Sequence, residues 1–413
     1  MTATPPIGRP APRMIFVAAL LVAVFASAII DIVIPISIVD IANTFSVLPG
    51  TIARLDSFIA IASVVTALFL AGFGTRFRYK FLVIIGILFI AACALGLFLA
   101  PTFLLAELIV PLNGIGSVMI IVTAQTFIGN SYPLDKKAKA IGWVAAAGTL
   151  ANAIGAPITG FMTGIGGWRS VLIWFMLPVT LFSLISVVLV FPYNPPKPLL
   201  STKKEPFLKG FKQVLTNKSA LACLVTAFFG NAFVFGGAVL QVTFLRQVFS
   251  ISPGFAALVG PFASTVLITG GAVIGGFAVN RFGRKRLTVI AISSAGLLTL
   301  LAYLMPNLSA FLAFRWAASP IIGIIAVAAT NLTLEQVPQF RSTTMALASA
   351  FSGVGTAVGI TVAGAVLNFY VNPVLGFKAL GLAIGALAFL GALVNMFFAK
   401  DPVKPISQTQ EKS

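Results

Sequence analysis

Residues 14–30 read MIFVAALLVAVFASAII, and Asp31 is the first charged residue after this run. Similar apolar runs recur along the chain, each roughly 20 to 28 residues long, which is enough for a helix to cross a hydrocarbon core about 30 Å thick. A helix also satisfies its own backbone hydrogen bonds in lipid. The sequence therefore predicts an all-α integral membrane protein.

The composition supports this prediction. Hydrophobic residues make up 59% of the 413 positions, and charged residues make up only 9%. Soluble domains carry about 25% charged residues, so this chain has too few polar groups to cover a globule of its size. The apolar residues occur in continuous runs and not in the alternating pattern of barrel strands, so we do not expect a transmembrane β-barrel.

Polar breaks divide the chain into twelve expected spans, six on each side of one long basic break. This division predicts an N-terminal six-helix bundle (1–192), a cytoplasmic linker (193–218), a C-terminal six-helix bundle (219–399) and a cytoplasmic tail (400–413). Within the linker we expect a short surface-lying helix near residues 207–214. The expected spans are 14–42, 56–74, 81–100, 103–131, 141–165, 168–192, 219–245, 255–279, 287–305, 308–335, 344–370 and 375–399.

The basic residues are distributed unevenly. The formal net charge is +18, and 22 of the 27 Lys and Arg residues fall on the side of the bilayer that holds both termini. This is the positive-inside pattern, so we expect both termini in the cytoplasm and the protein in the plasma membrane of a prokaryote. The same distribution argues against nucleic acid as a partner.

The two predicted halves resemble each other. At an offset of 204, residues 45–50 fall on residues 249–254, with Phe-Ser and Pro-Gly pairs in both, and Gly155 falls on Gly359. Many transporters are built from such repeats around a central binding site. The repeat predicts two pseudo-symmetric bundles with a cavity between them.

Residues 276–285 read GFAVNRFGRK. This stretch resembles the loop motif G-x-x-x-D-R-x-G-R-K of the major facilitator superfamily, with Asn280 in place of the acid. From the residues alone, a glycine permits close helix approach, and basic side chains anchor a loop at an anionic leaflet. An ordinary basic loop is the alternative. The residues that carry or replace motif positions are Gly276, Asn280, Arg281, Gly283, Arg284 and Lys285.

A weaker copy of this loop motif lies in the first half. Residues 71–80 keep only Arg76 and Lys80 of the pattern. The resemblance implies the twelve-helix fold of the superfamily, with two pseudo-symmetric halves that transport a small molecule.

A further stretch resembles the antiporter branch of that superfamily. Residues 155–160 read GAPITG, which is similar to the fifth-helix motif G-P-x-x-G-G, although Ala156 and Phe161 replace two glycines. On physical grounds, Gly155 and Gly160 permit close helix packing and Pro157 bends the helix.

Asp31 is the strongest candidate for function. It lies well inside the first span, where a charge is costly and needs a reason. The pattern D-x-x-x-P from Asp31 to Pro35 resembles the first helix of drug:proton antiporters. A carboxyl group removed from water binds a proton more readily than one in water, so we predict that Asp31 couples transport to protons. The alternative is a structural carboxyl that is hydrogen-bonded to a neighbouring helix.

Glu107 and Arg315 lie at similar depths in the fourth and tenth spans, which the superfamily relates by pseudo-symmetry. We predict a gate or coupling pair; the alternatives are a static ion pair or headgroup contact. Asp40 and Asp56 are expected near the outer surface. Neutral polar residues are further candidates for the cavity, with interhelical hydrogen bonding as the alternative for each. These residues are Asn113, Gln125, Asn231, Gln241 and Asn331.

The sequence excludes several classes of function. It contains no histidine, no phosphate-binding glycine loop and no metal-ligand spacing. We therefore expect no enzyme, cofactor, metal or ATP-driven pump, but a monomer in the lipid bilayer whose partners are a small molecule and protons. The first hypothesis is proton-coupled efflux of a small lipophilic or amphipathic compound, of the multidrug type. The alternatives are a facilitator or proton symporter for a polar metabolite such as a sugar or organic acid, and a non-transporting sensor or scaffold.

Overall fold

The computed structural model describes residues 14–73, 78–131, 134–191 and 207–402. Within these ranges all regular secondary structure is helical, and twelve helices are long and apolar enough to cross a membrane. The predicted all-α, twelve-span architecture is confirmed. The spans run over 14–45, 49–70, 79–99, 103–128, 142–166, 168–190, 218–249, 253–279, 284–304, 308–334, 343–369 and 373–398.

The first half contains the helices that precede the linker. They are α1 (Met14–Ser27), α2 (Ile30–Phe45), α3 (Pro49–Phe73), α4 (Tyr79–Leu99), α5 (Phe103–Ile109), α6 (Pro111–Ser131), α7 (Leu134–Gly166), α8 (Trp168–Val171), the π-helix η2 (Leu172–Met176) and α9 (Leu177–Val190).

The second half follows the short helix α10 (Phe207–Thr216), which lies where the sequence predicts one. Its elements are α11 (Lys218–Val239), α12 (Gln241–Phe249), α13 (Pro253–Ala257), the π-helix η3 (Leu258–Phe262), α14 (Ala263–Phe282), α15 (Arg284–Leu304), α16 (Leu308–Leu334), the 3-10 turn η4 (Pro338–Phe340), α17 (Arg341–Phe369) and α18 (Pro373–Phe398).

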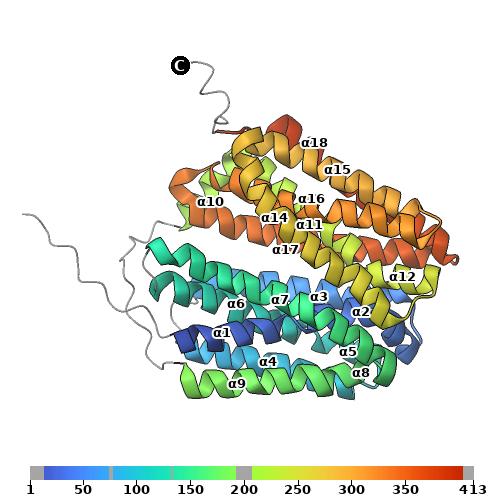
Figure 1. Ribbon diagram of the computed structural model, residues 1–413. Helices are drawn as coiled ribbons and strands as arrows, with labels where there is room; N and C mark the ends of the chain where they lie inside the picture. Colours follow the sequence, from blue (N-terminus) through green and yellow to red (C-terminus); the bar gives the residue numbers. More distant parts are fainter. Residues whose placement is uncertain (1–13, 74–77, 132–133, 192–206, 403–413) are drawn as a thin grey trace, which may run out of the picture.

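The two halves lie side by side along their length (Figure 1). We call the end that carries α10 the linker end and the end where α2 and α12 finish the far end. Contacts between the halves join α3 to α17, α7 to α13, and α2 to α12. Because α2, α12 and α13 all lie toward the far end, the halves are tied together there.

Several spans are interrupted near the middle of the protein. The first span breaks at Ala28 and Ile29, between α1 and α2, and the seventh breaks at Leu240, whose φ is −98° and ψ is 4°. The fourth breaks at Val110, before a proline that has no amide hydrogen to donate and so begins the next helix. Such breaks free backbone groups inside the membrane, which is tolerated where they face protein or a cavity.

The second span differs from its prediction. We expected it to begin at residue 56, but α3 begins at Pro49. Arg54 and Asp56 made this stretch look like a loop, whereas both lie within the helix. The prediction was wrong because two charges in one turn lower the local hydropathy without ending a helix.

At the far end, α3 and α17 meet backbone to backbone. A Cβ atom added to Gly50 would collide with the carbonyl oxygen of Gly364 and with Asn368 Oδ1. Asn368 Nδ2 also donates a hydrogen bond to Thr51 Oγ1 at 2.9 Å. Small residues permit this approach, as in other membrane helix pairs.

Candidate functional site

A cavity of about 380 Å³ lies between the two halves. Its walls come from α2, α3 and α7 of the first half and from α11, η3 and α17 of the second. Most of the lining is apolar. The polar lining residues are Asp31, Asp56, Ser63, Asn152 and Thr356.

Asp31 lies in the first turn of α2, directly after the break in the first span. Its side chain is exposed to the cavity. The amino-terminal end of a helix carries partial positive charge, which favours a carboxylate there. Asn113 Nδ2 of α6 donates a hydrogen bond to Asp31 Oδ1 at 3.2 Å. The structure thus brings together two of the predicted residues, although Asn113 itself is fully buried behind the cavity wall.

Asp56 is a second acid in this cavity, a role that we did not expect for a residue near the outer surface. It lines the cavity from α3, and its Oδ2 atom is buried without a hydrogen-bond partner in the described chain. Asp56, Ile59, Ala60 and Ser63 all line the cavity, and this spacing follows one face of a helix. That periodicity was the signal that could have identified Asp56.

The other neutral candidates lie outside the cavity lining. Asn231 Nδ2 donates to Ser352 Oγ at 3.0 Å and to Ala227 O at 2.8 Å, so it joins α11 to α17. Asn331 Nδ2 donates to the carbonyl of Val327 in its own helix. Gln241 is buried, and its Nε2 atom has no partner among the described residues. Gln125 is exposed on α6.

Glu107 and Arg315 do not form an ion pair in this structure. In the described residues, ion pairs join Asp40 to Arg246 and Glu335 to Arg341. Arg315 is buried in α16, which packs on α14 and α15. Glu107 is half-buried in α5 of the first half, and α5 contacts α3, α4 and α6 of that same half. The alternative of a static ion pair is therefore contradicted.

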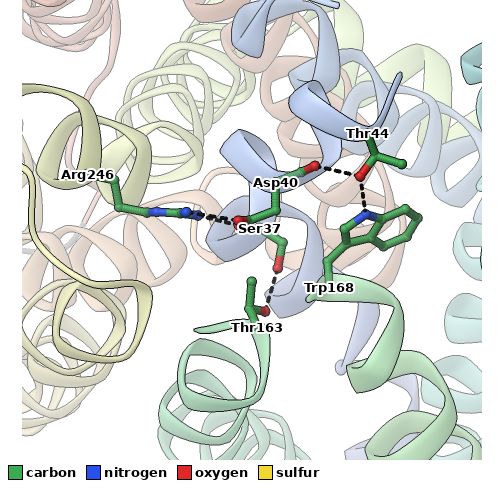
Figure 2. A network of polar contacts seen from close by, with 6 residues as sticks. All are labelled: Ser37, Asp40, Thr44, Thr163, Trp168 and Arg246. Carbon is green, nitrogen blue, oxygen red and sulfur yellow. Dashed lines mark hydrogen bonds and ion pairs between the residues drawn. The ribbon is translucent and has the colours of Figure 1, made fainter. Parts of the chain in front are cut away.

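An ion pair joins the two halves at the far end. Arg246 of α12 donates hydrogen bonds from both terminal nitrogens to the carboxylate of Asp40 in α2, as Figure 2 shows. The exposed fractions are 13% for the arginine and 25% for the aspartate side chain. We call these two residues the far-end clamp. We expected Asp40 only to lie near the outer surface, but its carboxylate has a partner in the opposite half.

Hydrogen bonds within the first half hold Asp40 in place (Figure 2). Thr44 Oγ1 donates to the carbonyl of Asp40 at 2.8 Å and accepts from Trp168 Nε1 at 3.0 Å. Ser37 and Thr163 share a hydrogen bond of 3.0 Å between α2 and α7. These contacts fix α2 against α7 and α8, so the carboxylate faces Arg246 from a rigid support.

Two glycines of the 155–160 motif in α7 pack against different helices, Gly160 against α13 and Gly155 against α2. A Cβ atom on Gly160 would lie 2.6 Å from Ala257 Cβ and 2.7 Å from Pro253 O, in the opposite half. A Cβ atom on Gly155 would lie 3.0 Å from Ile32 Cδ1 of α2. Pro157 lies inside α7, which stays helical through it.

Gly276 does not have the packing role that the loop motif suggested. A Cβ atom there would meet nothing within 4 Å, whereas one on Gly275 would lie 3.0 Å from Ile324 Cα of α16. One residue rotates a helix position by about 100°, so Gly275 and not Gly276 faces α16. The prediction of close packing at Gly276 was wrong.

The basic end of that loop starts α15. Gly283 has φ +81°, a conformation that suits glycine, and α15 begins at the next residue. The backbone amides of Arg284 and Lys285 donate to Asp401 Oδ2 at 2.9 Å and 3.2 Å. An acid after the last span therefore caps α15.

Other loop-motif residues have separate surroundings. The guanidinium of Arg281 lies over the ring of Phe282, with Cζ 5.6 Å from the centroid. Lys80 Nζ donates to the carbonyl of Val188 at 2.7 Å. Arg76 lies outside the described residues, as does the side chain of Asn280.

The sequence matches the model of a known protein family over most of its length. The family model described as Major Facilitator Superfamily matches residues 19–308 and 262–413. The chain belongs to the Major Facilitator Superfamily. It is a multi-pass membrane transporter.

Similar proteins are known by sequence and by structure. The transporter is 30% identical over 159 residues to the cis,cis-muconate transport protein of Acinetobacter baylyi (strain ATCC 33305 / BD413 / ADP1). This match covers 38% of the transporter and 37% of that relative, so the chain spans little more than a third of the relative's length.

Solved structures share the fold over nearly the whole chain. A bacterial homolog to the human lysosomal transporter Spinster, in an inward-facing and occupied conformation, matches with a TM-score of 0.74 and 19% identity. That match covers 94% of the transporter and 97% of the homolog. A D-xylose-proton symporter matches with a TM-score of 0.73 and 16% identity over 94% and 98% of the two chains. At these identities the likeness concerns the fold alone.

Proposed function

We propose that this transporter works by alternating access and exports a small lipophilic or amphipathic compound in exchange for protons. Asp31 is the proton-binding group in this proposal. The observation that carries it is the position of Asp31 at the wall of an apolar cavity between the halves, exposed to the cavity and hydrogen-bonded by Asn113. A proton and a cargo that compete for one carboxylate give obligatory exchange, because neither can occupy it while the other is bound.

The lining supports a lipophilic cargo. Sugars and other polar metabolites need several hydrogen-bonding partners, since a buried polar group without a partner is costly. The cavity offers mainly aliphatic and aromatic side chains, among them Phe235 and Ile360. We also propose that both termini are cytoplasmic, because the basic residues gather at the linker end. The linker end then faces the cytoplasm.

A second candidate function is transport of an organic acid. The partial similarity to a cis,cis-muconate transport protein favours it. Against it, the cavity wall formed by the described part of the chain contains no basic residue, and two of its residues are acids. A dicarboxylate would meet like charge there, which destabilises binding.

Transport by reconstituted protein tests the proposal. Purified transporter in liposomes is exposed to an imposed pH gradient, and the flux of lipophilic dyes, sugars and dicarboxylates is measured. We expect proton-driven flux of a lipophilic compound that is lost in Asp31→Asn. Glu335→Gln, which alters an acid outside the cavity, serves as the control. Flux that ignores the gradient in the unmodified protein, or survives in Asp31→Asn, would contradict proton coupling through Asp31.

A further inference from the structure

One carboxylate oxygen of Asp56 accepts no hydrogen bond in the described chain. Its Oδ2 atom is buried and has no partner in the described chain, although the residue lines a cavity large enough for a small molecule. Asp31 differs, because Asn113 donates to one of its oxygens. A buried carboxylate oxygen without a donor loses its hydrogen bonds to water without replacement, so a ligand that brings a donor is bound favourably at Asp56.

Two acids face one cavity. Asp31 and Asp56 come from adjacent helices, α2 and α3, and both line this cavity. Of the described residues that line the cavity, none is lysine or arginine. Bound protons or a cationic ligand can therefore neutralise this pair.

The opposite wall is suited to the apolar part of such a ligand. Phe235 of α11 lines the cavity, and its side chain is 46% exposed. An aromatic ring attracts a cation to its face and packs against aliphatic or aromatic groups. Ile360, Val239 and Pro261 continue the same apolar surface.

We propose that the cargo is a lipophilic amine, whose ammonium group binds between the carboxylates of Asp31 and Asp56 while its apolar part packs against Phe235. This inference rests on the proposed function for the cavity and names its substrate class. The ammonium donates the hydrogen bond that Asp56 Oδ2 lacks. It also supplies the charge that allows two neighbouring carboxylates to remain ionised in an apolar surrounding.

Binding to the purified transporter tests this assignment. The probes are phenylbutylamine, phenylbutanol and phenylbutanoate, which share one aryl chain and end in an ammonium, a hydroxyl or a carboxylate. Affinities are measured by titration calorimetry in detergent at neutral pH. We expect the amine to bind about tenfold or more tightly than the alcohol, as charge-assisted hydrogen bonds imply, and the carboxylate to bind least. A carboxylate that binds as well as the amine overturns the proposal.

Substitutions at Asp56 and Phe235 test whether these residues cause the preference for the amine. Asp56→Asn should lower amine affinity about tenfold and leave alcohol affinity within about twofold, whereas Asp56→Glu should keep most of the preference. Glu335→Gln is the matched control. Unchanged amine affinity in a folded Asp56→Asn protein overturns the proposal. If that variant does not fold, Phe235→Leu decides, because it must weaken the amine more than the alcohol, and an equal loss contradicts the assignment.

This experiment is separate from the test of proton coupling. It uses no membrane and no pH gradient, so amine selectivity is measured whether or not transport is proton-driven. Amine-selective binding without gradient-driven flux would contradict the coupling role of Asp31 alone. Gradient-driven flux of an acid, with no amine selectivity, would contradict the amine assignment alone.

Discussion

Arg246 forms hydrogen bonds through both terminal guanidinium nitrogens to the carboxylate of Asp40, and these two residues belong to opposite halves of the transporter. The pair lies at the far end, where the first and seventh spans finish. A conformational change that opens this end must break the pair. The far-end clamp therefore sets part of the free-energy difference between the closed and open far end.

Breaking the clamp should open the far end more often. Asp40→Asn should raise the rate at which a membrane-impermeant thiol reagent labels a cysteine placed at Ala238, on the cavity wall. We expect roughly a tenfold increase, because hydrogen bonds to charged groups contribute about 1.5–3 kcal/mol. The native cysteines, Cys93 and Cys223, are buried and give little background.

Exchanging the charges of Asp40 and Arg246 tests whether the faster labelling comes from loss of their ion pair. Asp40→Arg combined with Arg246→Asp should return labelling toward the original rate. Arg341→Gln, which breaks the ion pair at the linker end, should not increase labelling from the far side. A swap that labels as fast as the single variant would argue against the pair as a clamp.

We expect Asn113 to support transport by positioning the carboxylate of Asp31. In Asn113→Ala, Asp31 Oδ1 loses its donor, and we expect the rate of transport to fall about tenfold at unchanged protein abundance, since a hydrogen bond to a charged group is lost. Asn331→Ala is the matched control, because Asn331 donates only within its own helix to the carbonyl of Val327. Equal rates in the two variants would show that Asn113 does not position Asp31.

Close approach at Gly50 should not tolerate a larger side chain. Gly50→Val would push α3 away from the backbone of Gly364, and overpacking of this kind costs about 1–3 kcal/mol. A lower thermal unfolding temperature of the purified protein would report this loss. Gly142→Ala, whose added carbon meets none of the described residues, should not lower the unfolding temperature, because alanine favours a helix over glycine. Similar temperatures for both variants would contradict the importance of this contact.

We expect Asp401 to slow hydrogen exchange in the first turn of α15. Asp401→Ala removes the acceptor for the amides of Arg284 and Lys285. Loss of a helix cap costs about 1 kcal/mol, so hydrogen exchange at these two amides should become roughly fivefold faster. Asp401→Asn keeps a side-chain oxygen and should show a smaller change. Exchange that is equally slow in all three proteins would exclude a capping role.

The fold and one site residue could be predicted from the sequence. The twelve spans follow from hydrophobic runs that no soluble domain could bury. Asp31 stood out because it follows an apolar run without any other charge. Asp56 was missed because Arg54 lies two residues before it, and the pair resembled the end of a loop.

The remaining errors concern rotation and distance, which a linear pattern does not contain. Gly276 matches a motif position, but its neighbour Gly275 faces α16. Glu107 and Arg315 match in depth, yet they sit on helices whose main neighbours are in different halves. Asp40 and Arg246 form a pair instead because their helices, α2 and α12, contact each other.

The residues just after the last span bind two helices and the turn that follows a third. The backbone amide of Lys400 donates to Ser219 Oγ at the start of α11, and its carbonyl accepts from Gln336 Nε2 beyond α16. Asp401 holds the start of α15. Shortening the protein to residue 399 would remove all of these bonds, so a fluorescent reporter or affinity tag is better attached beyond residue 402 than directly after α18.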